Sequence, residues 1–304
     1  DDLNIVALIN DIRELHLSYG IRIFNISLNL PGSKPYNGPV GKFAYELDKL
    51  AYELDILIVN SVGNYSLDDM DYWVFDGSLD PVAQYPSFYY QTNPEIPGHS
   101  CEFTNLQEPA ESMNNISVGA LAGNFENGVT DGITPAREYP AYYSRKFHWD
   151  ISITINGSKL KKSQKNKHLV KPDLVFEGGD YLSQEAAMEV LTSPQDNSPY
   201  YGRLAGTSLA TPLVTSLIAQ LVKEYPTLQM TSIKALLINA AQSPAGINPP
   251  HFDSADGKKL YPISEKTYLT VFVDGEKYPI KEGDFVLIPP DADHYFENTG
   301  SSIL

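Results

Sequence analysis

The sequence predicts an α/β fold built on a mostly parallel sheet. Two nearly continuous apolar runs, residues 21–30 and 55–64, flank a stretch of helical periodicity at residues 40–54. Uninterrupted apolar strands joined by a helix are typical of parallel sheets that helices cover on both faces. With 304 residues, 42% of them hydrophobic, the chain is long enough to bury a large core.

The core elements are predicted in chain order by periodicity and by turn residues. Apolar residues three and four apart predict a first helix, and Gly20 suits its end. Pro31-Gly32 closes the strand that follows. The predicted core elements are a helix at 3–19, a strand at 21–30, a helix at 40–54, strands at 55–64 and 114–121, strand and loop at 168–179, and a helix from 209 onward.

Two segments interrupt this core. Residues 65–108 are rich in Asp, Pro and aromatic residues and show little periodicity, so we expect an insertion that covers or borders a binding cleft. The basic run at 159–167 is interpreted as a solvated hairpin tip.

Charge and composition exclude several classes of function. With 22 basic and 38 acidic residues the net charge is −16, so neither nucleic acid nor an anionic membrane is an expected partner. Cys101 is a lone cysteine, and no Cys/His spacing is typical of a structural zinc site. No apolar stretch has the ~18 residues that a membrane span needs. The sequence does not begin with Met, and its first residues already show helical periodicity. We therefore expect a truncated or processed chain.

The segment from Tyr200 to Pro226 carries the strongest chemical signal. Apolar residues at helical spacing from Leu209 onward put Ser208 at a helix start. There the backbone N–H groups lack partners, and a nucleophilic serine would gain support for an oxyanion from its own amide. The alternative is that Thr207 or Ser208 only caps the helix.

The heptapeptide GTSLATP, residues 206–212, resembles the nucleophile motif G-T-S-x-A-x-P of the subtilisin-like serine proteases (subtilases, peptidase family S8). Further segments resemble the same family in the same order: FNISLN (24–29), LIVNSVGN (57–64), PAESMNNISVGAL (109–121), AYYSRKF (141–147), KPDLVFEGG (171–179) and TSIKALLINAA (231–241). The resemblance implies a subtilisin-like three-layer domain over residues 1–245 that lacks the N-terminal part of the family fold.

The resemblance also implies the roles of individual residues. Ser208 would be the nucleophile and Asn64 the side chain that stabilises the oxyanion, with Gly63 allowing a tight turn. The bound peptide would contact Ser27, Leu28, Asn29, Ser61, Val62, Gly63 and Thr207. Asn29 replaces the usual glycine at the S1 pocket, and Phe176 and Glu177 replace small residues.

The catalytic Asp and His of the family lie upstream of the matched segments, and none of the six histidines stands in an H-G-T-x-V-A-G context. One explanation places Asp and His upstream of this chain, on a separate N-terminal fragment or in a removed part. The other is a catalytically inactive subtilase-like protein that binds peptides. The intact GTSLATP and Gly63-Asn64 favour the first.

Residues 246–304 form a different segment. Alternating strands separated by Asp274-Gly275 and Glu282-Gly283 predict antiparallel β structure. GDFVLIPPDADHYFEN (283–298) resembles the second motif of the cupin family through Gly283, Pro289, His294 and Asn298. A partial cupin, a degenerate β module and a β-rich extension remain open, and a sugar-sensing role is one alternative.

The expected activity is hydrolysis of peptide bonds in a peptide or protein substrate through an acyl-enzyme on Ser208. No cofactor and no protein-bound metal is expected. Calcium stays open because many family members bind it, but the chain has no D-x-D-x-D-G loop, and we assign no ligands.

Overall fold

The computed structural model describes residues 4–65, 101–126, 132–134, 137–148, 169–181, 183–192 and 200–241, residue 166, and short strands elsewhere. The predicted insertion at 65–108 and the basic run at 159–167 therefore lie largely outside the described residues. The chain divides into two compact units, residues 1–250 and 251–304.

A four-stranded parallel sheet forms the centre of the first unit. Its strands are β1 (Ile23–Ile26), β2 (Leu57–Ser61), β3 (Ile116–Leu121) and β8 (Leu174–Glu177), in the order β1-β2-β3-β8. Every neighbouring pair is parallel. β2 is fully buried, including its two polar residues Asn60 and Ser61. The predicted α/β fold with a parallel sheet is confirmed.

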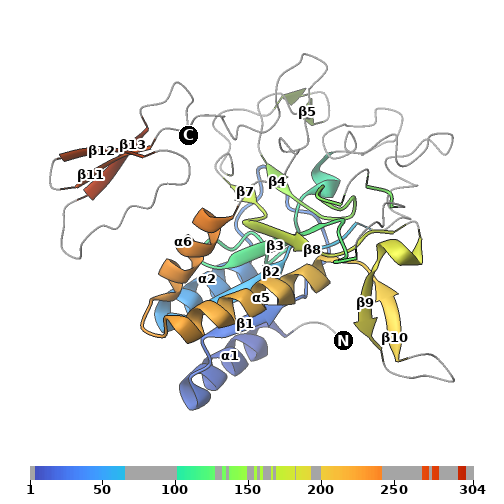
Figure 1. The fold of residues 1–304 in the computed structure, drawn as a ribbon. Helices are drawn as coiled ribbons and strands as arrows, with labels where there is room; N and C mark the ends of the chain where they lie inside the picture. Colours follow the sequence, from blue (N-terminus) through green and yellow to red (C-terminus); the bar gives the residue numbers. More distant parts are fainter. Residues whose placement is uncertain are drawn as a thin grey trace. The chain divides into compact units, whose positions relative to one another are not determined.

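Helices cover both faces of this sheet. In Figure 1, α5 (Thr207–Glu224) lies in front of the strands and α2 (Lys42–Leu54) behind them. α1 (Ile5–Tyr19) packs with α2 in one apolar cluster around Ile12, Phe43, Leu47 and Ile58. α1 begins at Asn4, whose side chain accepts from Ala7 N, and ends at Gly20 in the left-handed region, as predicted. α6 (Met230–Ala240) follows α5.

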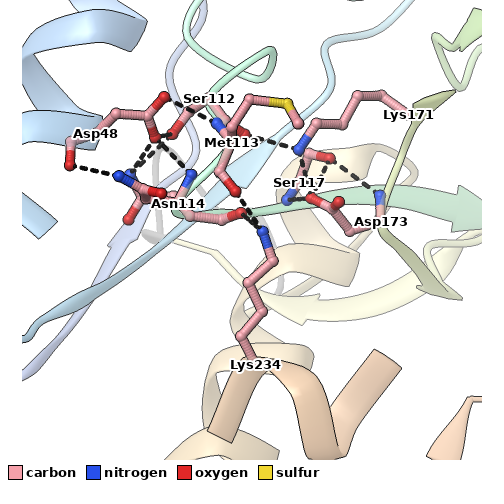
Figure 2. A network of polar contacts seen from close by, with 9 residues as sticks. Asp48, Ser112, Met113, Asn114, Ser117, Lys171, Asp173 and Lys234 are labelled. Carbon is pink, nitrogen blue, oxygen red and sulfur yellow. Dashed lines mark hydrogen bonds and ion pairs between the residues drawn. The ribbon is translucent and has the colours of Figure 1, made fainter. Parts of the chain in front are cut away.

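A polar network fixes the edge of the sheet where β3 and β8 begin (Figure 2). The carboxylate of Asp48, on α2, accepts from Met113 N and Asn114 N at 2.9 and 2.7 Å. Lys171 donates to the carbonyl of Ser112 and to Asp173 at 2.7 and 2.6 Å. The Lys-Pro-Asp motif of the sequence thus joins the segments that precede the two strands.

Smaller elements complete the described part of this unit. They are η2 (Cys101–Thr104), β4 (Phe147–His148), β5 (Thr154–Ile155), β6 (Ser158–Lys159), β7 (Val170–Lys171), η3 (Gln184–Ala186), β9 (Met188–Leu191) and β10 (Tyr201–Leu204). The antiparallel hairpin of β9 and β10 was not predicted from the sequence.

The second unit contains β11 (Leu269–Val273), β12 (Glu276–Ile280) and β13 (His294–Asn298). β11 pairs antiparallel with both β12 and β13, which confirms the antiparallel character expected of the tail. His294 and Asn298 begin and end β13, whereas Gly283 and Pro289 lie outside the described residues. Among the described helices of the whole chain, none has the length and hydropathy of a membrane span.

Candidate active site

The carboxyl end of β2 turns sharply at Gly63 and leads into Asn64. Gly63 has a φ of 93°, and a Cβ atom there would lie 2.3 Å from Oε1 of Gln107. The backbone conformation requires glycine at this position, whereas the flexible end of the Gln107 side chain could move to make room for a Cβ atom. The tight turn expected at Gly63 is therefore confirmed, and it directs the chain toward the start of α5.

The side chain of Asn64 contacts the first residue of α5. Its Oδ1 atom accepts hydrogen bonds from the backbone N and from Oγ1 of Thr207, both at 2.9 Å. Because two donors occupy the oxygen, the orientation of the amide is fixed and its Nδ2 is the free end. Asn64 is exposed, and its Nδ2 has no hydrogen-bond partner among the residues that the structure describes.

Helix α5 begins with Gly206 as its N-cap, and no side chain caps it. The alternative in which Thr207 or Ser208 caps the helix is therefore wrong. Ser208 is the second helical residue, so its N–H lacks an intrahelical acceptor. A methyl group on Gly206 would lie 3.4 Å from Nδ2 of Asn64 and 3.8 Å from N of Ser208. The two donors border the same space in front of Gly206.

Pro212 breaks the hydrogen-bond ladder one turn after Ser208. Proline has no N–H, so it cannot donate to the carbonyl of Ser208 four residues earlier. The hydroxyl of Ser27, which follows β1, donates to this carbonyl at 3.4 Å. The segment after β1 thus lies beside the first turn of α5.

Asn29 connects the segments that follow β1 and β2. Its Nδ2 donates to the carbonyl of Ser61 at 2.7 Å, and its Oδ1 accepts from Oγ of Ser61 at 2.9 Å. The side chain that replaces the family's usual glycine is therefore folded onto β2. Leu28, next to it, is 42% exposed.

Val62 is completely buried, whereas a residue that contacts a bound peptide must present an accessible group. Its side chain packs in an apolar cluster with Tyr36, Leu106 and Phe147. Its N–H donates to Val118, and its carbonyl accepts from Gln107. With side chain and backbone engaged, Val62 has no group left for a peptide, and Ser61 is also completely buried. We leave both residues out of the substrate contacts proposed below.

Tyrosines support the backbone just before Ser208. The hydroxyl of Tyr143 lies 2.8 Å from the carbonyls of Gly178 and Gly179, and N of Gly206 donates to Gly178 at 3.0 Å. Tyr181 donates to the carbonyl of Ala205 at 3.0 Å. Burial raises the pKa of Tyr143 well above its usual value, so its hydroxyl stays protonated and able to donate. Sequence reasoning missed these residues, although AYYSRKF carries three aromatic residues in one short segment.

Arg145 was also missed. It is 8% exposed, and its Nε donates to the backbone carbonyl of Asn64 at 3.0 Å. A charged residue among aromatic and apolar neighbours was the available signal, but its partners are distant in sequence.

The histidines do not supply a base within the described residues. His16, whose side chain is described, lies on α1 and its Nδ1 is 2.9 Å from the carbonyl of Ile21, before the start of β1. Ser208 lies beyond the other end of that strand. In the part of the chain that the structure describes, no three His, Cys, Asp or Glu side chains gather as metal ligands.

Comparisons with known proteins found a relative in sequence and several solved structures that are similar to this chain. It is 30% identical over 253 residues to an uncharacterized protein, y4bN, of Sinorhizobium fredii, and covers 51% of that protein's length. Among solved structures, it is similar to the prenylagaramide maturation protease PagA, with a TM-score of 0.41 and 17% identity over 79% of this chain and 59% of that one. Sphericase gives a TM-score of 0.44 and 18% identity over 78% and 54%.

Family models divide the chain between two descriptions. The cupin domain matches residues 267–304. The subtilase family, peptidase S8, matches residues 2–260, which include the motif around Ser208 and the whole four-stranded sheet. The chain belongs to the subtilase family of serine peptidases.

Proposed function

We propose that the chain carries the nucleophile and the oxyanion-binding groups of a subtilisin-type serine endopeptidase. The observation that supports this most directly is the orientation of Asn64. Because Thr207 occupies its Oδ1, the amide presents Nδ2 to the space that Ser208 also borders. Two preorganised donors around one point are what a tetrahedral oxyanion needs.

The first step forms the acyl-enzyme. The Oγ of Ser208 attacks the carbonyl carbon of the scissile peptide, a base removes its proton, and the π electrons of the carbonyl move to its oxygen. Nδ2 of Asn64 and N–H of Ser208 then donate to this oxyanion. Its collapse expels the amine, which takes up the proton, and leaves an ester on Ser208.

The second step uses water in the same way. The base removes a proton from water, the hydroxide adds to the ester carbonyl, and the same two donors stabilise the second oxyanion. Collapse returns the proton to Ser208 and releases the acid. The base and its orienting carboxylate are expected upstream of this chain, on the same polypeptide or on a separate N-terminal fragment.

Ser27, Leu28 and Asn29 are the proposed contacts of the peptide on the acyl side. Ser27 already lies beside the first turn of α5, and Leu28 is exposed next to it. Gly63 and Thr207 are the proposed peptide contacts next to Asn64. Gly63 directly precedes Asn64, and the backbone N of Thr207 donates to Oδ1 of Asn64.

A fluorophosphonate probe tests this proposal in the full-length protein. The probe forms a phosphonate ester only with an activated serine, so mass spectrometry should find the adduct on Ser208. Ser208→Ala should abolish labelling. Ser216→Ala is the matched control, because Ser216 is an exposed serine on the same helix and should leave labelling unchanged.

Folded full-length protein that is not labelled would contradict the proposal and favour the peptide-binding alternative. If the base lies on a separate N-terminal fragment, this chain alone would not be labelled. Adding the fragment would then restore the adduct on Ser208.

A further inference from the structure

The guanidinium of Arg145 lies inside the protein at the turn that carries Asn64. Arg145 belongs to a segment that pairs with this turn, through an antiparallel bridge between Asn64 and Ser144. The N–H of Tyr65 donates to the carbonyl of Tyr143 at 2.7 Å, and the N–H of Arg145 donates to Gly63 at 3.3 Å. The two segments are thus held together on both sides of Asn64.

The side chain of Arg145 adds contacts to the same turn. Its Nε donates to the carbonyl of Asn64 at 3.0 Å. Its guanidinium carbon lies 4.9 Å from the ring centroid of Tyr65, within the range of a cation–π contact. Backbone and side chain of one arginine therefore contact three consecutive residues, with Asn64 in the middle.

The far end of the guanidinium is anchored elsewhere. Its Nη1 donates to Oγ of Ser33 at 2.9 Å, to the carbonyl of Asn105 at 3.0 Å, and to the carbonyl of Phe103. These acceptors come from the loop after β1 and from η2 with the residue that follows it. A planar guanidinium presents donors in a fixed fork, which the ammonium of lysine on its flexible stem cannot reproduce.

Such anchoring matters because Asn64 is an exposed residue. The hydrogen bonds from Thr207 fix the amide at its tip, but its Cα position depends on the turn. A displacement of about 1 Å at a reacting group can lower a rate about 100-fold.

We propose that Arg145 is a positioning residue that holds the Asn64 turn so that its side-chain amide meets the oxyanion. This inference rests on the function proposed above for Asn64 and Ser208. It assigns to Arg145 an effect on the rate of acylation that passes through Asn64.

Steady-state kinetics of the full-length protein on a peptide substrate test this inference. We expect Arg145→Lys to lower kcat about 10-fold and to leave KM within about twofold, because the oxyanion exists only in the transition state. Asn64→Ala should lower kcat about 100-fold or more. In the Asn64→Ala background, Arg145→Lys should add less than about twofold.

Additive effects of the two substitutions would overturn the inference, because a residue that only stabilises the fold acts independently of Asn64. Arg22→Lys is the matched control. Arg22 is also an arginine that donates to several backbone carbonyls, including Pro226 and Leu228, but it lies at the other end of β1. It should alter stability alone.

A spectroscopic measurement separates this inference from the proposed function. The side-chain amide resonances of Asn64 in an NMR spectrum can be assigned because they are lost in Asn64→Ala. Observing them does not require the protein to be catalytically active. Arg145→Lys should shift or broaden them, while Arg22→Lys should not. If Ser208 were never labelled but the resonances moved as expected, the proposed function would fail and the positioning contact would stand. Unchanged Asn64 resonances in Arg145→Lys would overturn the positioning role of Arg145.

A milder variant covers the case in which Arg145→Lys does not fold. Ser33→Ala removes one acceptor of the guanidinium at the end remote from Asn64. It should shift the same Asn64 resonances in the same direction, by a smaller amount. A folded Ser33→Ala protein with wild-type resonances would count against the anchoring role.

Discussion

At the start of α5, Thr207 fixes the side-chain amide of Asn64, and Gly206 leaves space beside it. Thr207 donates twice to Asn64, while Gly206 has an extended backbone with a φ of 164°. Any residue can adopt this conformation, so glycine at 206 is not required by backbone strain. Its lack of a side chain instead leaves room beside the two donors, where a methyl group would make ordinary contacts only.

Gly206→Ala tests this distinction. We expect the free energy of unfolding to change by less than about 1 kcal/mol, because alanine restricts the unfolded chain but is a poorer N-cap residue than glycine. Labelling of Ser208 by a fluorophosphonate should slow by about 10-fold or more, since the methyl group fills the space for the oxyanion. Wild-type labelling with wild-type stability would contradict the assignment of this space.

Asn60 on β2 presents the opposite situation, a buried polar side chain without hydrogen bonds to the described residues. It is completely buried, and neither its Nδ2 nor its Oδ1 has a partner within the described part of the chain. Asn60→Val should raise the free energy of unfolding by about 1–3 kcal/mol, because it removes a buried and unpaired amide. Chemical denaturation measures this change.

Asn115→Val is the matched control for Asn60. Asn115 is equally buried, but its Oδ1 accepts from Ile58 N at 2.9 Å and its Nδ2 donates to Ser112 at 2.8 Å. The same substitution there should destabilise the protein. If both substitutions destabilise, Asn60 has a partner such as an ordered water, and the expectation for it is wrong.

Residue-level prediction from the sequence worked where the signal was local. Gly63 as a turn and Ser208 at a helix start follow from their immediate neighbours. The pairing of Asn29 with Ser61 and the contacts of Arg145 could not be predicted, because each joins segments 32 to 112 positions apart. The burial of Val62 was missed for the same reason.

Elements of the fold are joined by the polar network shown in Figure 2. Lys234, on α6, donates to the carbonyls of Met113 and Asn115, both at 2.7 Å. Burial lowers the pKa of Lys234, but the nearby carboxylate of Asp173 opposes this shift. The contacts tie α6 to the turn that precedes β3.

Lys234→Met should lower the free energy of unfolding by about 1–3 kcal/mol. Methionine keeps most of the apolar stem but leaves two carbonyls without their donor. Lys223→Met, on the exposed surface of α5, is the matched control and should change stability by less than about 0.5 kcal/mol. Equal effects of the two substitutions in thermal or chemical denaturation would show that the network contributes nothing.

The elements themselves were largely predictable. Apolar runs predicted all four strands of the central sheet, and helical spacing predicted α1, α2 and α5. The strands proved shorter than the runs, because the residues that follow β1 and β2 turn toward α5. The hairpin of β9 and β10 was missed, since its exposed residues have no clear alternation of apolar and polar positions.

At the scale of the whole first unit, the buried carboxylate of Asp180 makes the stability of the protein depend on pH. Asp180 is 2% exposed and accepts from Thr134 N at 2.7 Å and from Tyr181 N at 2.8 Å. Burial nevertheless raises its pKa to about 6. The folded protein therefore holds this proton more tightly than the unfolded chain does, and the stabilisation is present at low pH.

This contribution should disappear as pH rises from about 4 to above 6, where the folded state must bury a charged carboxylate. Asp180→Asn cannot titrate. We expect the difference in unfolding free energy between wild type and Asp180→Asn to change by up to about 3 kcal/mol over this interval. Denaturation at several pH values measures it. A constant difference would show that Asp180 has an ordinary pKa.

For the whole molecule, the ordered motifs predicted the family, and the continuous apolar runs on either side of a helix predicted the parallel sheet. The role of the cupin-like residues 267–304 stays a prediction, because it depends on side chains outside the described residues.

The rate of phosphonylation of Ser208 in Asn64→Asp, set against wild type, tests the central claim most directly. Aspartate is isosteric with asparagine and can still accept from Thr207, but it has no amide to donate to the oxyanion. We predict that the Asn64→Asp protein folds as wild type and reacts about 100 to 1,000 times more slowly. An unchanged rate would contradict the account, because Asn64 would then play no part in the chemistry of Ser208.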